Sequence, residues 1–172
     1  MKPANLFSLL SVPCLFASLL LSALIAGFFY AYSVDVMPAL DRMEPAEAIR
    51  AMQQINIAVR NPVFFTTFFV TPAAAAATAL LLYLSGSKSA ALAMVGAAAV
   101  YMVAAFLPTA SINVPMNEAL ALQETGMADG HLADVWQAYS TRWTFWNTFR
   151  TVASSIAVLL TGLAIALHFR KA

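Results

Sequence analysis

The chain has 172 residues, of which 62% are hydrophobic and only 10% are charged, and its formal net charge is +1. Soluble domains carry about a quarter charged residues, so this composition argues against a soluble globular protein. A net charge so close to zero also argues against nucleic acid as a partner. The single cysteine, Cys14, makes no disulfide within the chain and indicates no compartment.

Four long stretches of the sequence carry no charge. They are 32, 27, 29 and 19 residues long and lie between Lys2 and Asp35, Arg60 and Lys88, Lys88 and Glu118, and Arg150 and Arg170. About 20 apolar residues suffice for a helix to cross the hydrocarbon core of a bilayer. We therefore predict an all-α fold, a four-transmembrane-helix bundle that forms one integral membrane domain over residues 1–172. The predicted spans are 6–33, 62–84, 89–108 and 146–168.

The first half of the chain contains two further predicted features. The apolar run from Leu6 to Tyr32 is longer than a signal-peptide core of roughly 7–15 residues, which favours an uncleaved helix. Residues 45–60 have the period of an amphipathic helix, which we expect outside the spans, in the membrane interface or over the end of the bundle. Its predicted buried face comprises Ile49, Met52, Asn56 and Val59.

The second half begins at a clear helix-start signal, Asn61-Pro62. Ser85-Gly86-Ser87-Lys88 predicts a tight turn, so the second and third spans should be antiparallel neighbours. We expect the third span to end near Leu107, followed by a loop over 108–130 with a short helix from Pro115 to Thr125. An extended last helix is expected from His131, with its first half outside the fourth span.

Charge predicts the orientation. The side that holds both predicted termini carries cations and no acid, whereas the other side carries all eight Asp and Glu residues together with four arginines. The cations of the first side are Lys2, Lys88, Arg170 and Lys171, and the arginines of the other are Arg42, Arg50, Arg60 and Arg142. The positive-inside rule then favours both termini in the cytoplasm, in an inner or plasma membrane.

The start of the last helix carries the most informative pattern. Trp136, Tyr139, Trp143, Asn147 and Arg150 recur at spacings of three and four and so share one stripe. Such a stripe is typical of an aromatic belt at the membrane surface. An ionisable residue inside a span, however, usually faces the bundle interior and indicates a pocket. Both interpretations stay open.

Two asparagines surround a proline in Asn113-Val-Pro-Met-Asn117. The residues alone favour turn and capping chemistry here, although two amides four residues apart can also donate hydrogen bonds into one cavity. Tyr30 and Asn56 allow the same two interpretations.

The two histidines bear on cofactors. If one helix joins His131 and His168, they lie roughly 55 Å apart and cannot both bind one haem. His131, near Asp134, is either a helix-start residue or a base. The sequence contains no HExxH, CxxC, P-loop or GxGxxG pattern, which argues against a nucleotide-dependent activity.

Several of these motifs together resemble a known family. They are Gly27-Phe-Phe-Tyr-Ala-Tyr-Ser-Val-Asp-Val-Met-Pro-Ala-Leu40, Ala51-Met-Gln-Gln-Ile-Asn56, Arg60-Asn-Pro62, Asn113-Val-Pro-Met-Asn117, Trp136, and Trp143-Thr-Phe-Trp-Asn-Thr-Phe-Arg150. In this order, and over nearly the whole chain, they resemble the domain-of-unknown-function family 1772, which is also called anthrone oxygenase-like.

The resemblance implies a membrane oxygenase or oxidoreductase that acts on a small hydrophobic aromatic substrate with O2, in a pocket at the outer face of the bundle. Members of polyketide pathways oxidise an anthrone to an anthraquinone. Many of those members have a histidine in the first span near Gly27, and this chain has none there. The missing histidine argues against anthrone as the substrate more than it argues against the predicted architecture.

A cofactor-independent mechanism assigns roles to the candidate residues. His131 or Asp134 would take the substrate proton, and amide or guanidinium groups would donate to the developing oxyanion. The proposed donors are Asn113, Asn117, Asn147 and Arg150, and Trp136, Tyr139 and Trp143 would form a flat apolar slot. Tyr30 and Asn56 complete the candidate substrate-binding set.

Two other classes of function remain open. The protein could be a redox carrier that binds haem or quinone, although no cofactor is firmly implied and no metal site is predicted. It could instead be a non-enzymatic membrane subunit or a small permeation module. The expected partners are the lipid bilayer and a hydrophobic small molecule, and Gly96 with its alanine-rich surroundings would permit a homo-oligomer.

Overall fold

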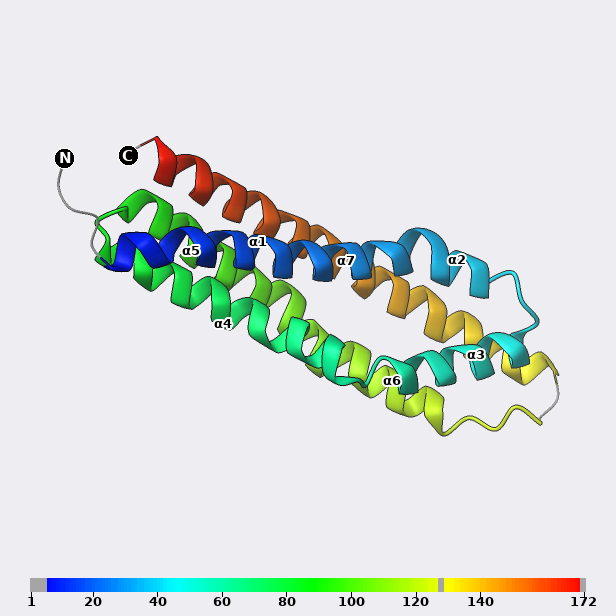
Figure 1. Ribbon diagram of the computed structural model, residues 1–172. Coiled ribbons are helices and arrows are strands. Elements are labelled where there is room, and N and C mark those ends of the chain that lie inside the picture. Colours follow the sequence, from blue (N-terminus) through cyan, green and yellow to red (C-terminus); the bar gives the residue numbers. More distant parts are fainter. Residues whose placement is uncertain (1–5, 127–128, 171–172) are drawn as a thin grey trace.

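A computed structural model describes residues 6–126 and 129–170, and every regular element in these residues is helical (Figure 1). The elements are α1 (Leu6–Ala31), the π-helical turn η1 (Tyr32–Val36), α2 (Met37–Leu40), α3 (Pro45–Ala58), α4 (Pro62–Leu84), α5 (Lys88–Tyr101), the π-helical turns η2 (Met102–Phe106) and η3 (Thr109–Asn113), α6 (Val114–Ala121) and α7 (Asp129–Phe169). The all-α prediction is confirmed.

Four continuous helical segments are long and apolar enough to cross a membrane. They are Leu6–Leu40, Pro62–Leu84, Lys88–Ala121 and Gly130–Phe169. The chain is therefore an integral membrane protein with a four-helix bundle, as predicted. The start of α1, the turn between α4 and α5 and the end of α7 lie at one end of the bundle (Figure 1). Lys2 and Lys171, which enter the charge argument, lie outside the described residues, and the cytoplasmic orientation stays a prediction.

The four long helices form a closed ring of contacts, in which α1 and α5 each pack against both α4 and α7. Small side chains allow these helices to approach closely. Ser18 of α1 is hydrogen-bonded to Thr78 of α4 at 2.9 Å, and a Cβ on Gly96 of α5 would lie 3.5 Å from Leu160 of α7. This distance is an ordinary van der Waals contact, and a role of Gly96 in a homo-oligomer stays a prediction.

The structure corrects the predicted ends of the first and third long helices. Helical backbone continues past Ser33 to Leu40, and past Leu107 to Ala121, so no loop begins at Pro108. The short helix of the second outer segment ends at Ala121, not at Thr125. Our sequence reasoning took proline as a helix end, but here the helices accommodate proline by widening.

Each π-helical turn ends two residues before a proline, namely Pro38, Pro108 or Pro115. Proline lacks an N–H group, and in an α-helix its ring clashes with the carbonyl four residues earlier. That fourth preceding residue lies inside the wider turn in all three cases, where the backbone bonds reach five residues back, as from Met37 N to Tyr32 O. Because backbone groups in a membrane must stay paired, a wide turn is preferable to a break.

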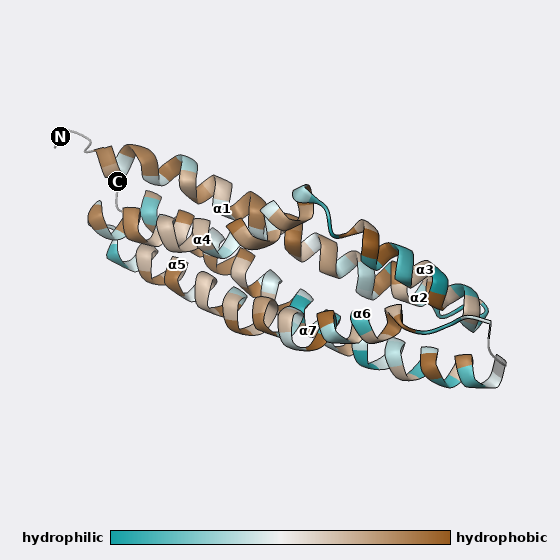
Figure 2. Ribbon diagram, turned by 90° about the horizontal axis from the view of Figure 1, so that it is seen from below, coloured by the Kyte–Doolittle hydropathy of each residue, from teal (hydrophilic) through white to brown (hydrophobic). Residues whose placement is uncertain are grey.

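At the other end of the bundle, α3 covers α2, α6 and the first turns of α7. Its buried face comprises Ala48, Ile49, Met52 and Asn56, with Val59 half-buried, which confirms the predicted amphipathic helix. Hydrophilic residues concentrate at this end, in contrast to the apolar remainder of the bundle (Figure 2). With 41 residues, α7 is roughly 60 Å long and extends beyond a hydrocarbon core of about 30 Å.

Asn61 fixes the start of α4. Its Oδ1 accepts a hydrogen bond of 3.0 Å from the backbone N of Phe64, and Pro62 opens the helix, as predicted. α4 thereby places a run of phenylalanines directly beneath α3, where the candidate site lies.

Candidate functional site

A cavity of about 460 Å³ lies between α1, α4, η2, η3 and α7, beneath α3. Nine aromatic side chains line it: Phe28, Phe29, Tyr32, Phe64, Phe65, Phe68, Phe69, Phe106 and Trp143. The polar residues in its wall are Asn56, Arg60, Thr109, Asn113, Asn117, Glu118, Asn147 and Arg150. An apolar wall with a few convergent polar groups is typical of a small-molecule site.

Arg150 is the most unusual residue of this wall, because it is only 3% exposed and the hydrogen bonds of its guanidinium go to neutral groups. Its Nη1 donates to Thr109 Oγ1 at 2.9 Å, and its Nη2 donates to Asn147 Oδ1 at 3.0 Å. Its Cζ lies 4.4 Å from the ring centre of Phe29 and 5.4 Å from that of Trp143. Rings attract a cation but do not neutralise it, so the site keeps a buried positive charge.

Asn147 holds Arg150 in place from the other side. It is fully buried, and its Nδ2 donates to the Phe29 carbonyl at 2.7 Å and to Ser33 Oγ at 2.7 Å. These bonds tie α7 to α1 beside the wide turn η1. With its Nδ2 donating to Phe29 of α1 and to Ser33 of η1, the Oδ1 of Asn147 is turned to the guanidinium.

Asn117 organises the aromatic part of the stripe. Its Oδ1 accepts from Tyr139 Oη and from Trp143 Nε1, each at 2.9 Å. Asn113 is buried and its Nδ2 donates to the Trp143 carbonyl over a long 3.5 Å. It makes no side-chain cap on α6. The capping interpretation that we favoured for this motif is therefore wrong, because η3 continues the helix and turns both amides inward.

Three residues of the cavity wall have a buried polar atom that makes no hydrogen bond within the described part of the structure. These atoms are Asn56 Nδ2, Asn113 Oδ1 and Arg150 Nε. Buried polar groups are almost always paired, so a cluster of three unsatisfied ones requires an explanation. Two of the three are donors, and they would suit an electron-rich oxygen of a bound molecule.

The aromatic wall is itself ordered by stacking. Phe64, Phe68 and Phe106 form a stacked series, with ring centres 5.6 Å apart for the first pair and 5.2 Å for the second. Tyr32 packs against Trp143 at 5.6 Å from the opposite side. The wall is therefore rich in aromatic rings, which suits contact with a flat aromatic molecule.

The predicted stripe on α7 faces the bundle interior, because Trp136, Tyr139, Trp143, Asn147 and Arg150 are each at most 7% exposed. A belt of aromatics facing lipid would be exposed. Within the stripe, Trp143, Asn147 and Arg150 line the cavity. Tyr139 supports it through Asn117, and Trp136 Nε1 donates to Asp41 Oδ1 at 3.0 Å, farther toward the end of the bundle.

The remaining predicted site residues fall into two groups, those that line the cavity and those that do not. Asn56, Asn113 and Asn117 line the cavity. His131 and Asp134, the two proposed bases, are exposed on the first turns of α7 and do not line it. Tyr30 is 58% exposed on the outside of α1. Position alone therefore removes the reason for assigning these three residues to this site.

Sequence reasoning missed several wall residues. Glu118 is exposed at the cavity edge and is the carboxylate among the lining residues, and Thr109 binds Arg150. Phe64 and Phe68 on α4 were also missed, although their spacing of four puts them on one helix face. In a span where almost every residue is apolar, such a face does not stand out.

Neither histidine is placed to bind a cofactor in the cavity. His168 lies at the far end of α7, with its Nδ1 3.0 Å from Ser87 Oγ, and neither histidine lines the cavity. Among the described residues, no group of three or more His, Cys, Asp or Glu side chains comes together as a metal site would require. A haem or quinone function stays a prediction that rests on sequence alone.

Comparison with known families agrees with the motifs in the second part of the chain, after residue 62. Residues 63–160, more than half of the chain, match the model of the anthrone oxygenase family. The matched segment includes Asn113, Asn117, Trp143, Asn147 and Arg150. Comparison with curated proteins and with solved structures gave no significant match in either case. The chain belongs to the anthrone oxygenase family.

Proposed function

We propose that this protein is a membrane oxygenase that oxidises a small, flat aromatic substrate of the anthrone class with O2 inside the cavity. The observation that carries the proposal is Arg150, a buried guanidinium held by neutral partners beside stacked aromatic rings. An isolated buried charge is strongly unfavourable unless it is compensated. A substrate that becomes an anion in the cavity would supply the compensating charge at the moment of reaction.

The chemistry of an anthrone fits such a site. Its reactive C–H bond lies between two aromatic rings and opposite a carbonyl, so loss of the proton places the negative charge largely on the carbonyl oxygen. The carbanion then forms a C–O bond to O2. Proton uptake by the resulting peroxide and loss of one water leave a second carbonyl. One anthrone and one O2 thus give one anthraquinone and one water.

We assign groups of the wall to proton removal, to the oxyanion and to the aromatic rings of the substrate. We assign the oxyanion to Arg150, with the unpaired amide donor of Asn56 as a second group. The stacked Phe64, Phe68 and Phe106 would hold the rings. The proton acceptor is assigned to Glu118, the carboxylate of the lining residues, in place of His131 or Asp134.

The test is turnover by the purified protein in lipid nanodiscs. Anthrone is supplied, and O2 consumption and anthraquinone absorbance are followed against empty nanodiscs, because anthrones also oxidise unaided. Arg150→Lys keeps the charge but loses the planar fork, and we expect kcat to fall by about 100-fold. Arg142→Lys, at an exposed position on the same helix and outside the cavity, is the matched control and should match wild type. Equal turnover by the two variants would contradict the proposal.

A further inference from the structure

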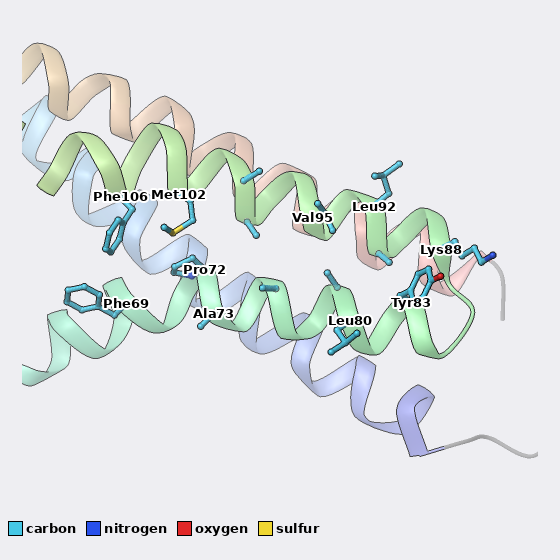
Figure 3. Close-up of a pocket in the computed structure, with 15 residues that line it drawn as sticks. Phe69, Pro72, Ala73, Leu80, Tyr83, Lys88, Leu92, Val95, Met102 and Phe106 are labelled. Atoms are coloured by element: carbon cyan, nitrogen blue, oxygen red, sulfur yellow. The ribbon is translucent and has the colours of Figure 1, made fainter. Parts of the chain in front are cut away.

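A second hollow runs along the outside of the bundle between α4 and α5 (Figure 3). It is an apolar groove of about 1090 Å³, and alanines in both helices leave it wide. Its larger side chains include Leu80, Leu92 and Val95, each more than half exposed, as expected for a surface that faces lipid.

The groove and the cavity share a wall. Phe69 and Phe106 line both, and no other residue is common to the two sets. Their rings meet edge to face across the gap between α4 and η2, with centres 5.6 Å apart. Figure 3 shows them opposite one another at the end of the groove that is remote from Lys88. Two side chains therefore lie between the lipid-facing groove and the cavity.

These two side chains differ in how firmly they are held. Phe106 is stacked on Phe68 at 5.2 Å, inside the aromatic wall. Phe69 is 53% exposed, so its ring has room to rotate toward lipid, and this motion would separate it from the rings of Phe65 and Phe68, whose centres lie 6.1 and 5.4 Å away. Aromatic side chains at exposed positions change rotamer on a fast timescale. The pair therefore has the properties of a gate in which Phe106 stays in place and Phe69 moves.

Another part of the cavity edge is chemically different. Arg60 and Glu118 lie there, both exposed and both ionisable. An apolar ring system would have to leave the bilayer and pass these charges to enter from that side. Entry along the groove keeps the molecule in an apolar environment throughout.

We propose that the groove between α4 and α5 is the route by which a flat apolar substrate passes from the bilayer into the cavity, with Phe69 and Phe106 as its gate. The inference rests on the proposed function for the class of molecule that enters. It adds the direction of entry and the residues that control it. A molecule already dissolved in lipid reaches the site without crossing water.

The experiment plugs the groove and measures binding without turnover. In a background of Cys14→Ser, Trp136→Phe and Trp146→Phe, in which Trp143 is the single tryptophan, Ala76→Cys places a thiol inside the groove. Ala77→Cys places one on the same helix, exposed and outside it. Each protein in nanodiscs is labelled with a bulky lipid-soluble maleimide or left unlabelled. Anthraquinone is the probe, and its arrival is followed by saturable quenching of Trp143 in the cavity wall.

We expect labelling at Ala76→Cys to lower the rates of association and dissociation by about tenfold while the Kd stays within a factor of two, because a plug alters the path and not the site. Labelled Ala77→Cys should behave as the unlabelled protein does. Equal rates for the two labelled variants would overturn the entry route alone. Absence of saturable quenching in unlabelled protein would overturn the route together with the substrate class. Quenching without anthrone turnover would instead refute the proposed reaction and leave the route intact.

Discussion

Asn147 Oδ1 accepts a hydrogen bond of 3.0 Å from Nη2 of Arg150, one turn further along α7. The same amide donates to the Phe29 carbonyl and to Ser33 Oγ, so one side chain both fixes the guanidinium and joins α7 to α1. Arg150 is thereby held rigidly, although its partners are neutral. A preorganised donor of this kind stabilises a developing anion without first having to reorient.

Asn147→Ala should therefore lower the stability of the protein. The substitution leaves buried groups of Phe29 and Arg150 unpaired, and we expect the free energy of unfolding to fall by about 1–3 kcal/mol. Thr148→Ala is the matched control, because Thr148 also bonds to Ser33, at 3.0 Å, but at an exposed position. Its loss should change stability far less. Denaturant unfolding in nanodiscs measures both, and equal effects would refute the special role of Asn147.

The stripe on α7 was readable from sequence for a simple physical reason. Helical periodicity is local, and polar residues such as Asn147 and Arg150 stand out in an apolar span. The same reasoning found the buried face of α3 and the start of α4 at Asn61-Pro62. Pattern reasoning succeeds where a residue contrasts with its neighbours.

Pattern reasoning failed where that contrast was absent, or where one residue type is compatible with two local structures. Phe64 and Phe68 form one wall of the cavity. The faces of α4 are all largely apolar, so the sequence does not distinguish the face that lines the cavity. We predicted that a loop begins at Pro108 and that a separate short helix begins at Pro115, whereas π-helical turns carry one helix past both prolines. That error hid Thr109 and turned Asn113 into a supposed cap. His131 and Asp134 were chosen by chemical type alone, and only the fold shows that Glu118 is the carboxylate at the cavity.

A second prediction concerns Asn117 and tests whether its role is to accept hydrogen bonds from Tyr139 and Trp143. Asn117→Ala removes the acceptor shared by Tyr139 and Trp143, and we expect unfolding to become easier by about 1–3 kcal/mol. Binding of anthraquinone should weaken as well, because Trp143 loses its anchor. Asn117→Asp keeps the acceptor oxygens and should restore most of both properties. Thermal unfolding and fluorescence titration test this, and an aspartate variant no better than alanine would contradict it.

Glu118 gives a third prediction, which concerns chemistry alone. Glu118→Gln preserves the size of the side chain and one acceptor oxygen but cannot take up the substrate proton. We expect anthrone turnover to fall by about 100-fold while anthraquinone binds as before. Glu124→Gln, exposed in the segment between α6 and α7 and outside the cavity, is the control and should leave turnover unchanged.

Deuterium at the reactive carbon of anthrone sharpens that test. If removal of this proton limits the rate in the glutamine variant, the isotope effect on turnover should grow relative to wild type. A Glu118→Gln protein with normal turnover would show that another group accepts the proton.

Pro115 gives a prediction that sets stability against function. In Pro115→Ala the backbone N–H returns, so η3 can revert to a regular α-helix, and the free energy of unfolding should rise by up to about 3 kcal/mol. The reverted turn would rotate Asn113 and Thr109 relative to Arg150. We expect anthraquinone binding to weaken by about tenfold, the equivalent of one lost hydrogen bond. Pro13→Ala, in the regular helix α1 and far from the cavity wall, should also gain stability but should bind normally. Equal binding by the two variants would mean that the wide turn serves only to accommodate proline. Weaker binding by Pro115→Ala alone would show that this proline shapes the site at the expense of helix stability.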